Sequence, residues 1–306
     1  MNYKIDVAIQ SYKKPESLIY TLFSLKEYCG DFIDTVYIND DCSLDGSVEK
    51  YQEKSLQERL APLKLKIRTN LKKGGFGQTL FTKKMKPISY NHFVRWLKAY
   101  LTNNLYEEND IRYQWAINST DKKYLMIIHD DIKFFGNIAD LYIKCLDKNP
   151  NLAIVGDFGS CNICLEKNCS PQKILQGYRP SKFYPLTKSK HGPLPFFYRR
   201  GCRINEWCCM INVEIARKIA TQHHCYFGQM EDKGDTAAYW FYMINKLGYD
   251  FFDPVVEKEK RPNYYLHSWQ GHSGHSVWQD EGHGLSVYKK EFILECLKNE
   301  FNYEIL

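Results

Sequence analysis

Tyr124-Leu-Met-Ile-Ile-His-Asp-Asp-Ile132 is the stretch that is most informative about the fold. Its first five residues can all lie in a buried strand, and they run directly into His129, Asp130 and Asp131. A continuous apolar run is typical of a central strand that is covered on both faces of its sheet. Adjacent carboxylates repel each other and are costly to desolvate, so a pair at the end of such a strand indicates a bound cation or a polar ligand. An oxygen-rich site of this kind suits Mn²⁺ or Mg²⁺ carrying a phosphate, and the alternative is that both aspartates only cap the next turn.

The composition is that of an ordinary globular protein. The 306 residues are 44% hydrophobic and 25% charged, enough for one large domain or for a domain with an appended lobe. The net charge of +6 favours anionic partners such as nucleotide phosphates or a lipid surface, and it is too small to indicate nucleic acid. No apolar run reaches the roughly 20 residues that span a bilayer, and the first residues hold no signal-peptide core. We therefore expect a cytoplasmic protein, with the inner face of the membrane as a further location, whose 11 cysteines are thiols or metal ligands.

Strand and helix patterns alternate along the chain. The order predicts βαβ units with right-handed parallel crossovers. In open α/β sheets ligands collect at the carboxyl ends of strands, and three polar clusters fall at such ends: Ser11 with Tyr12, Asp40 with Asp41, and Asp130 with Asp131. Strands are predicted over residues 4–10, 32–39, 63–70, 124–128, 152–156 and 204–212, and helices over 15–29, 89–101, 138–146, 213–219 and 236–247, with a further helix after residues 40–47 that Ser43 or Asp45 could cap.

Two segments carry a resemblance to a known family. Val7-Ala-Ile-Gln-Ser-Tyr-Lys-Lys-Pro-Glu-Ser-Leu18 and Tyr37-Ile-Asn-Asp-Asp-Cys-Ser-Leu-Asp-Gly-Ser47 resemble the opening of the family-2 glycosyltransferases of GT-A fold. The resemblance implies an α/β, Rossmann-like fold with a mixed, mostly parallel sheet flanked by helices. In that family the first loop, here Ser11 and Tyr12, and the acidic turn, here Asp40, Asp41 and Ser43, hold the base and ribose of a nucleotide-sugar. Asp41 is then the first candidate to contact the nucleobase and Asp40 the second, while an Asx-rich helix entry is the alternative reading.

His129-Asp-Asp131 falls where the family carries its Asp-x-Asp metal motif, with His129 in place of the first acid. The resemblance implies that Asp131 binds the cation on the donor diphosphate and that Asp130 lies beside the donor. His129 could bind the metal, orient the sugar or form a local hydrogen bond. GT-A enzymes often complete the metal shell with a histidine near the end of the catalytic domain. That implies His267, with His272 as the alternate, on a Gly- and His-rich segment that suits a C-terminal lid.

Met230-Glu-Asp-Lys-Gly-Asp235 resembles the Glu-Asp motif of the same family. There the acid removes a proton from the acceptor hydroxyl, which implies Asp232 as general base and Glu231 as the second choice. An inverting transfer needs such a carboxylate on the face opposite the leaving diphosphate. The alternative is that either acid only caps the following helix.

A cysteine cluster lies outside the family pattern. Cys161, Cys164 and Cys169 have C-x2-C-x4-C spacing, and Cys202 follows at a distance that could close a tetrahedral site. We predict a structural Zn²⁺ in this insertion, with independent buried thiols as the alternative.

These patterns together predict one catalytic domain in three parts. Residues 1–156 form the nucleotide-sugar half, 157–203 the Cys-rich insertion, and 204–306 the acceptor half with the lid. The expected reaction is an inverting, metal-dependent transfer from a nucleotide-diphosphate sugar, UDP-sugar first, to a hydroxyl of a surface glycan or lipid-linked glycan. Peripheral membrane association is compatible with such an acceptor, and no nucleic-acid partner is expected. The alternatives are a catalytically silent nucleotide- or carbohydrate-binding protein, a nucleotidyltransferase, and an RNA-binding protein, which the lack of clustered basic stripes disfavours.

Overall fold

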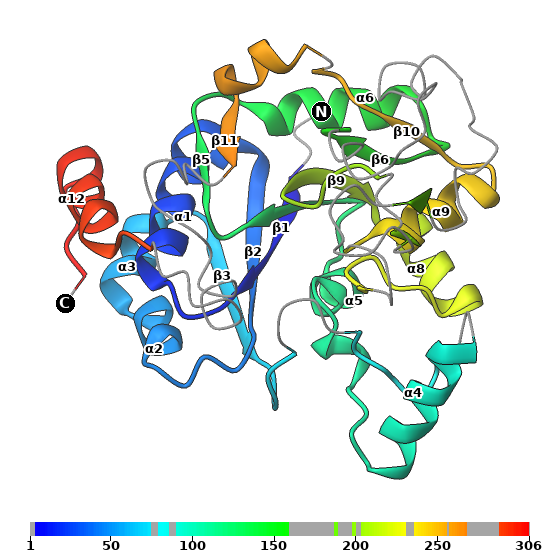
Figure 1. Cartoon of the computed structure of the whole chain (residues 1–306). Coiled ribbons are helices and arrows are strands. Elements are labelled where there is room, and N and C mark those ends of the chain that lie inside the picture. The colour runs from blue at the N-terminus through cyan, green and yellow to red at the C-terminus, as the bar shows by residue number, and fades with distance from the viewer. Residues whose placement is uncertain are drawn as a thin grey trace.

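A mixed seven-stranded sheet lies at the centre of the computed structural model (Figure 1), which describes residues 4–74, 79–85, 90–158, 187–188, 198–199, 203–230, 236–255, 257–267 and 288–305. The strand order is β10-β6-β9-β4-β1-β2-β3. Only β9 is antiparallel to its neighbours in this sheet. The strands are β1 Ile5–Ser11, β2 Ile33–Asp40, β3 Lys64–Thr69, β4 Tyr124–His129, β6 Leu152–Gly156, β9 Cys208–Asn212 and β10 Asp250–Phe252.

Helices cover both faces of the sheet. One layer holds α1 Pro15–Cys29, α2 Ser47–Gln52, α3 Lys54–Leu60, α6 Ile138–Lys148 and α12 Lys290–Phe301. The other holds α5 Gln114–Ser119, α8 Val213–His223 and α9 Ala238–Lys246. The predicted mixed, mostly parallel sheet flanked by helices is therefore confirmed.

The two helix layers explain why residues 124–128 are apolar at every position. Tyr124, Met126 and Ile128 pack into the α1 layer, whereas Leu125 and Ile127 pack into the α8 layer. Because successive strand residues point to opposite faces, a strand covered on both sides needs an apolar residue at every position.

Helix entries follow local capping chemistry with one difference from expectation. The Asn137 side chain accepts a hydrogen bond from the amide of Asp140 at the start of α6, and Asn212 does the same for Ile215 in α8. At α2 Asp45 Oδ1 accepts from the amide of Ser47, the first helical residue, at 3.1 Å, although neither Ser43 nor Asp45 occupies the N-cap position. That position is Gly46, whose φ of +86° suits glycine.

Short elements that the apolar pattern does not predict complete the fold. β5 Ile132–Phe134 pairs antiparallel with β11 Tyr265–His267, and β7 Thr187–Lys188 pairs with β8 Tyr198–Arg199. 3-10 helices lie at Gly30–Phe32, Glu108–Asp110 and Lys258–Asn263. The helix predicted over residues 89–101 is α4 Tyr90–Leu101, which projects from the body of the molecule (Figure 1). None of the helices in the described ranges is both long enough and apolar enough to cross a membrane.

Candidate active site

Three strand ends meet at one edge of the sheet. Ser11 in β1 pairs with Asp40 in β2, and Gln10 in β1 pairs with His129 in β4. Because these strands are parallel, their carboxyl ends lie side by side. The three polar clusters predicted from the sequence therefore share one edge.

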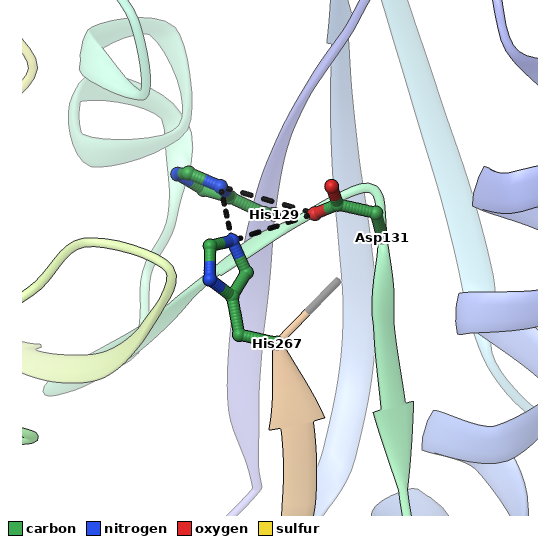
Figure 2. Close-up of side chains that lie close together, drawn as sticks. All are labelled: His129, Asp131 and His267. Atoms are coloured by element: carbon green, nitrogen blue, oxygen red, sulfur yellow. Dashed lines mark hydrogen bonds and ion pairs between the residues drawn. The ribbon is translucent and has the colours of Figure 1, made fainter. Parts of the chain in front are cut away.

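His129, Asp131 and His267 point their ligand atoms toward one another, as Figure 2 shows. His267 Nε2 lies 3.1 Å from His129 Nδ1 and 3.7 Å from Asp131 Oδ1, and His129 Nδ1 lies 3.9 Å from that same oxygen. The approach depends on the small sheet, because β11 pairs His267 with Ile132, the residue after Asp131. Residues 138 positions apart thus converge on one point.

The three side chains fit a divalent metal. A point equidistant from the three atoms lies about 2.1 Å from each, and nitrogen and oxygen ligands hold divalent metals at about this distance. Burial lowers the pKa of His129 and that of His267 to about 4, so both imidazoles are neutral at pH 7 and can offer a lone pair. Two imidazoles and a carboxylate form a donor set that suits a transition metal.

Lys14 brings a buried ammonium group to the two aspartates. Its Nζ lies 2.7 Å from Asp130 Oδ1 and 3.5 Å from Asp131 Oδ2, with about 3% of its side chain exposed. Burial raises the pKa of Asp130 to about 6, against the opposing effect of Lys14. Burial would also raise the pKa of Asp131, but Lys14 and the two histidines outweigh it and hold that pKa well below its usual range. Asp131 therefore presents an ionised oxygen to the histidines while its other oxygen faces Lys14.

Helix α1 holds the turn between β4 and β5 through three hydroxyl groups. Ser17 Oγ donates to the Asp130 carbonyl oxygen at 2.8 Å. Thr21 Oγ1 accepts from the Ile132 amide and Ser24 Oγ from the Phe134 amide, each at 3.2 Å. Residues three and four positions apart share one face of a helix, so the three hydroxyls form a row along the turn. The row fixes the backbone on both sides of Asp131.

A second group of residues, in the segment just before β9, lies beside the histidines. The Trp207 ring stacks on His267 with centroids 4.5 Å apart, and the Trp207 carbonyl oxygen accepts from the His129 amide at 3.0 Å. Glu206 Oε1 lies 3.9 Å from His129 Nε2, and its other oxygen accepts from Arg203 Nε at 3.1 Å. Glu206 thus places a carboxylate beside the outer nitrogen of His129, beyond direct hydrogen-bond distance.

Asp40 holds the acidic turn together. Ser43 donates to Asp40 through both its amide, at 2.8 Å, and its hydroxyl, at 2.5 Å. The Ser43 hydroxyl also accepts from the Lys13 amide at 3.0 Å, which links the turn to the loop after β1. Burial raises the pKa of Asp40. Both Asp40 oxygens thus serve the local structure.

Asp41 faces a different environment. Its Oδ1 accepts from Asn70 Nδ2 at 3.0 Å and from the Gly74 amide at 2.8 Å. Asp41 lines a cavity of about 10 Å³ together with Asp110, Arg112, Gly228 and Gln229, among others. Ser11 and Tyr12 are buried, the Asp41 amide donates to the Ser11 carbonyl oxygen at 2.9 Å, and Ser11 Oγ lies 2.8 Å from the Tyr51 hydroxyl.

Several predicted residues lie outside the described part of the chain. They are the general-base candidates Glu231 and Asp232, the alternate ligand His272, and the four cysteines Cys161, Cys164, Cys169 and Cys202. Cys208 and Cys209, which follow Cys202, are buried on opposite faces of β9.

Sequence reasoning missed Lys14, Arg203, Glu206 and Trp207. The Lys13-Lys14-Pro15 run could not predict a buried lysine at the site, because nothing in it shows which of the two lysines is buried. Glu206 and Trp207 lie directly before the strand β9, and this position could have identified them as candidate site residues.

The fold was compared with known proteins. No protein-family model matches the chain, and no curated protein matches it in sequence. Solved structures with a similar fold include a mannosyltransferase from Pyrobaculum calidifontis in complex with GDP-Man and Mn²⁺, with 13% identity and a TM-score of 0.46 over 82% of this chain. The chain spans about half of that protein, 54% of its length.

Two further solved structures have a similar fold. Mouse xyloside xylosyltransferase 1 has 13% identity and a TM-score of 0.39, with 81% of this chain and 83% of that one covered. Glucosyl-3-phosphoglycerate synthase from Mycobacterium tuberculosis, in complex with phosphoglyceric acid, has 10% identity and a TM-score of 0.42, with 82% and 69% covered. The functional argument therefore rests on the geometry of the site.

Proposed function

We propose that the protein is a metal-dependent glycosyltransferase that uses a nucleotide-diphosphate sugar. The observation that carries the proposal is the convergence of His129, Asp131 and His267. They lie at the edge of the sheet formed by the carboxyl ends of its strands, where β2 also leads into the acidic turn. A divalent cation held by these three side chains would offset the charge of the leaving diphosphate. Of the two predicted ions, Mn²⁺ is favoured over Mg²⁺ because imidazole suits transition metals.

The donor nucleotide is assigned to the loop after β1 and the turn after β2. Asp41 is the proposed contact to the base and Asp40 is the second candidate, on the family resemblance. Both oxygens of Asp40 accept from Ser43 and hold the turn. Ser11, Tyr12 and Ser43 would position the base and ribose, and Asp130 would lie beside the diphosphate. UDP is the first nucleotide to test.

The proposed acceptor is a hydroxyl group of a glycan or lipid-linked glycan. Inversion requires a carboxylate that removes the acceptor proton as the sugar is attacked from the side opposite the diphosphate. Asp232 is assigned this role and Glu231 is the second choice, on the family resemblance alone. We also propose a structural Zn²⁺ bound by Cys161, Cys164, Cys169 and Cys202. A location at the inner face of the membrane is a further proposal.

A nucleotidyltransferase is the alternative that the site geometry favours most. It would hold the metal and the nucleotide in the same way, but it would break the α–β phosphoanhydride bond of a nucleoside triphosphate instead of the bond between the anomeric carbon and the diphosphate oxygen. A silent binding protein would use the same residues to hold a nucleotide without turnover. The products formed from the donor distinguish these cases.

The test is a screen of UDP-, GDP-, dTDP- and CMP-sugars with and without Mn²⁺, followed by thermal shift and by release of free sugar and nucleoside diphosphate. We expect one nucleotide class to stabilise the protein only with Mn²⁺, and donor hydrolysis to yield the nucleoside diphosphate. Asp131→Ala should lose both responses. Asp121→Ala, which removes a carboxylate with about 83% of its side chain exposed, should keep them.

Each outcome of the screen has a distinct meaning. In a parallel incubation of a nucleoside triphosphate with a sugar phosphate, release of pyrophosphate would establish the nucleotidyltransferase instead. Stabilisation without any turnover would favour the silent binding protein, and no response to any donor would refute the proposed function.

A further inference from the structure

We propose that α4 is a docking surface for an anionic lipid bilayer. Its apolar side chains form one stripe, because residues spaced by three, four and seven positions share a face of a helix. The stripe faces solvent, with exposed fractions of 80% for Tyr90, 43% for Phe93, 45% for Val94, 37% for Leu97, 54% for Tyr100 and 74% for Leu101. Amphipathic helices of soluble proteins normally turn such a stripe toward the core, so an outward stripe marks an interaction site.

The opposite side of α4 fixes this orientation. His92 is buried, and its ring centroid lies 5.0 Å from that of Phe81. Trp96 Nε1 donates to the Thr82 carbonyl oxygen at 3.0 Å. The helix is therefore anchored through its polar and aromatic side, while the apolar stripe stays outside.

Aromatic contacts stiffen the exposed face. The Trp96 ring stacks on Tyr100 with centroids 5.5 Å apart and on Phe93 with centroids 6.3 Å apart. Tyr90 and Tyr100 in the stripe are of a residue type that prefers the boundary between water and acyl chains, because the ring combines an apolar body with a polar tip. The composition of the stripe thus suits a lipid interface better than water.

Charge decides between a lipid surface and a second copy of the chain. Residues 71–106 contain no Asp or Glu, and their basic residues are Lys72, Lys73, Lys83, Lys84, Lys86, Arg95 and Lys98. Lys83 and Lys98 are exposed, whereas Lys84 pairs with Glu108 at 2.8 Å and Arg95 lies over the Phe81 ring on the anchored side of α4. Lys98 follows Leu97 by about 100° of helix rotation and so flanks the stripe. Two such surfaces would repel each other, whereas anionic headgroups would attract both.

If the proposed function is correct, the position of α4 suggests that docking on a bilayer would serve the delivery of the acceptor. The chain leaves the carboxyl end of β3 toward α4, and α4 projects on the side of the sheet where the carboxyl ends lie (Figure 1). Lys72 Nζ also donates to the Leu105 carbonyl oxygen at 2.7 Å, which ties the segment after β3 to the chain beyond α4. A bilayer bound by α4 would bring the acceptor of a lipid-linked glycan toward the candidate active site.

Vesicle flotation without nucleotide or Mn²⁺ tests the docking separately from the proposed function. The probes are phosphatidylcholine vesicles with and without phosphatidylglycerol. We expect the wild type to float with the anionic vesicles and to be released by added NaCl. The Phe93→Ser/Leu97→Ser variant should partition at least about tenfold more weakly, because two inserting apolar side chains are lost. Lys83→Glu/Lys98→Glu should lose the preference for anionic lipid.

A matched control uses exposed apolar residues at another part of the molecule. Leu247→Ser/Phe252→Ser replaces side chains with exposed fractions of 39% and 45% and should float like the wild type. Far-ultraviolet circular dichroism and thermal unfolding check that each variant folds, which the exposure of the replaced residues favours.

Three results would overturn the proposal. They are a wild type that floats with neither vesicle, a stripe variant that floats like the wild type, and a wild-type dimer in light scattering that the stripe variant alone dissociates. The last result would assign the stripe to a second copy. Vesicle binding in a protein that fails the donor screen would leave the docking intact and remove only the proposed function.

Discussion

Lys14 lets a buried carboxylate stay ionised beside a second one. Its ammonium contacts both Asp130 and Asp131, and all three side chains are less than a tenth exposed. Breaking a buried ion pair by removing one partner is strongly destabilising, because the other charge is left uncompensated. A metal bound by Asp131 would supply positive charge at the same place. Lys14 and the metal are therefore expected to act together on the stability of the turn.

We predict that Lys14→Met lowers the free energy of unfolding by about 3 kcal/mol or more without metal, and that Mn²⁺ restores part of the loss. Urea unfolding with and without Mn²⁺ measures both effects. Lys54→Met is the matched control, since Lys54 pairs with Glu58 on the surface with about 89% of its side chain exposed, and it should change little. A Lys14→Met variant as stable as the wild type would contradict this role.

At the scale of elements, α1 positions the turn that carries Asp131. The hydroxyls of Ser17, Thr21 and Ser24 all reach backbone groups between residues 130 and 134. Thr21→Val keeps the shape of the side chain but leaves the buried Ile132 amide without its acceptor. Such a loss costs about 1–3 kcal/mol. The same change should weaken Mn²⁺ binding, because the backbone beside Asp131 is no longer held.

Chemical unfolding and Mn²⁺ titration of Thr21→Val check both expectations. The control is Thr221→Val, whose exposed hydroxyl donates only to carbonyl oxygens of its own helix, α8. Equal losses of stability in the two variants would argue against a special role for the α1 hydroxyls.

The elements of the sheet could be predicted because they follow from apolar patterns. Strands such as Tyr124–His129 are apolar at every position before the last, and amphipathic helices such as Ile138–Lys148 repeat at helical spacing. The parallel-strand rule then brings Asp40 and His129 to one edge. The pairing of β5 with β11 could not be predicted, since strands of three residues carry no readable period. The contact of His267 with Asp131 depends on that pairing, and sequence supplied it only through the family resemblance.

Side-chain burial was the other feature of the site that could not be predicted from the sequence. Lys14 and the α1 hydroxyls look like polar surface residues, because local sequence does not show what packs against them. The stripe on α4 shows the reverse case. Its amphipathic period was evident, but the period alone does not tell which side of a helix faces solvent.

At the scale of the whole molecule, the C-terminal helix α12 belongs to the same body as the first helix of the chain. Ile293 and Leu297 are fully buried in the cluster that also contains Leu22 and Phe23 of α1. Glu300 accepts from the Tyr20 hydroxyl at 2.5 Å and pairs with Lys133 of β5 at 3.0 Å. The end of the chain thus supports the two elements that flank the candidate metal turn.

We predict that Leu297→Ala lowers the free energy of unfolding by about 2–5 kcal/mol in a single cooperative transition. Unfolding followed by both fluorescence and circular dichroism measures the size and the cooperativity. Leu101→Ala, at an exposed position on α4, should cost far less. A separate early transition in Leu297→Ala would show that α12 unfolds on its own and does not share the main core.

The central claim is that His129, Asp131 and His267 bind one metal ion, and Mn²⁺ titration followed by electron paramagnetic resonance tests it most directly. The signal of free Mn²⁺ disappears on binding, so the affinity is read without any substrate. We expect one site in the wild type, at least about tenfold weaker binding in His267→Ala and in Asp131→Asn, and no change in His223→Ala, which removes a histidine at the end of α8. A His267→Ala variant that binds Mn²⁺ as tightly as the wild type would contradict the claim.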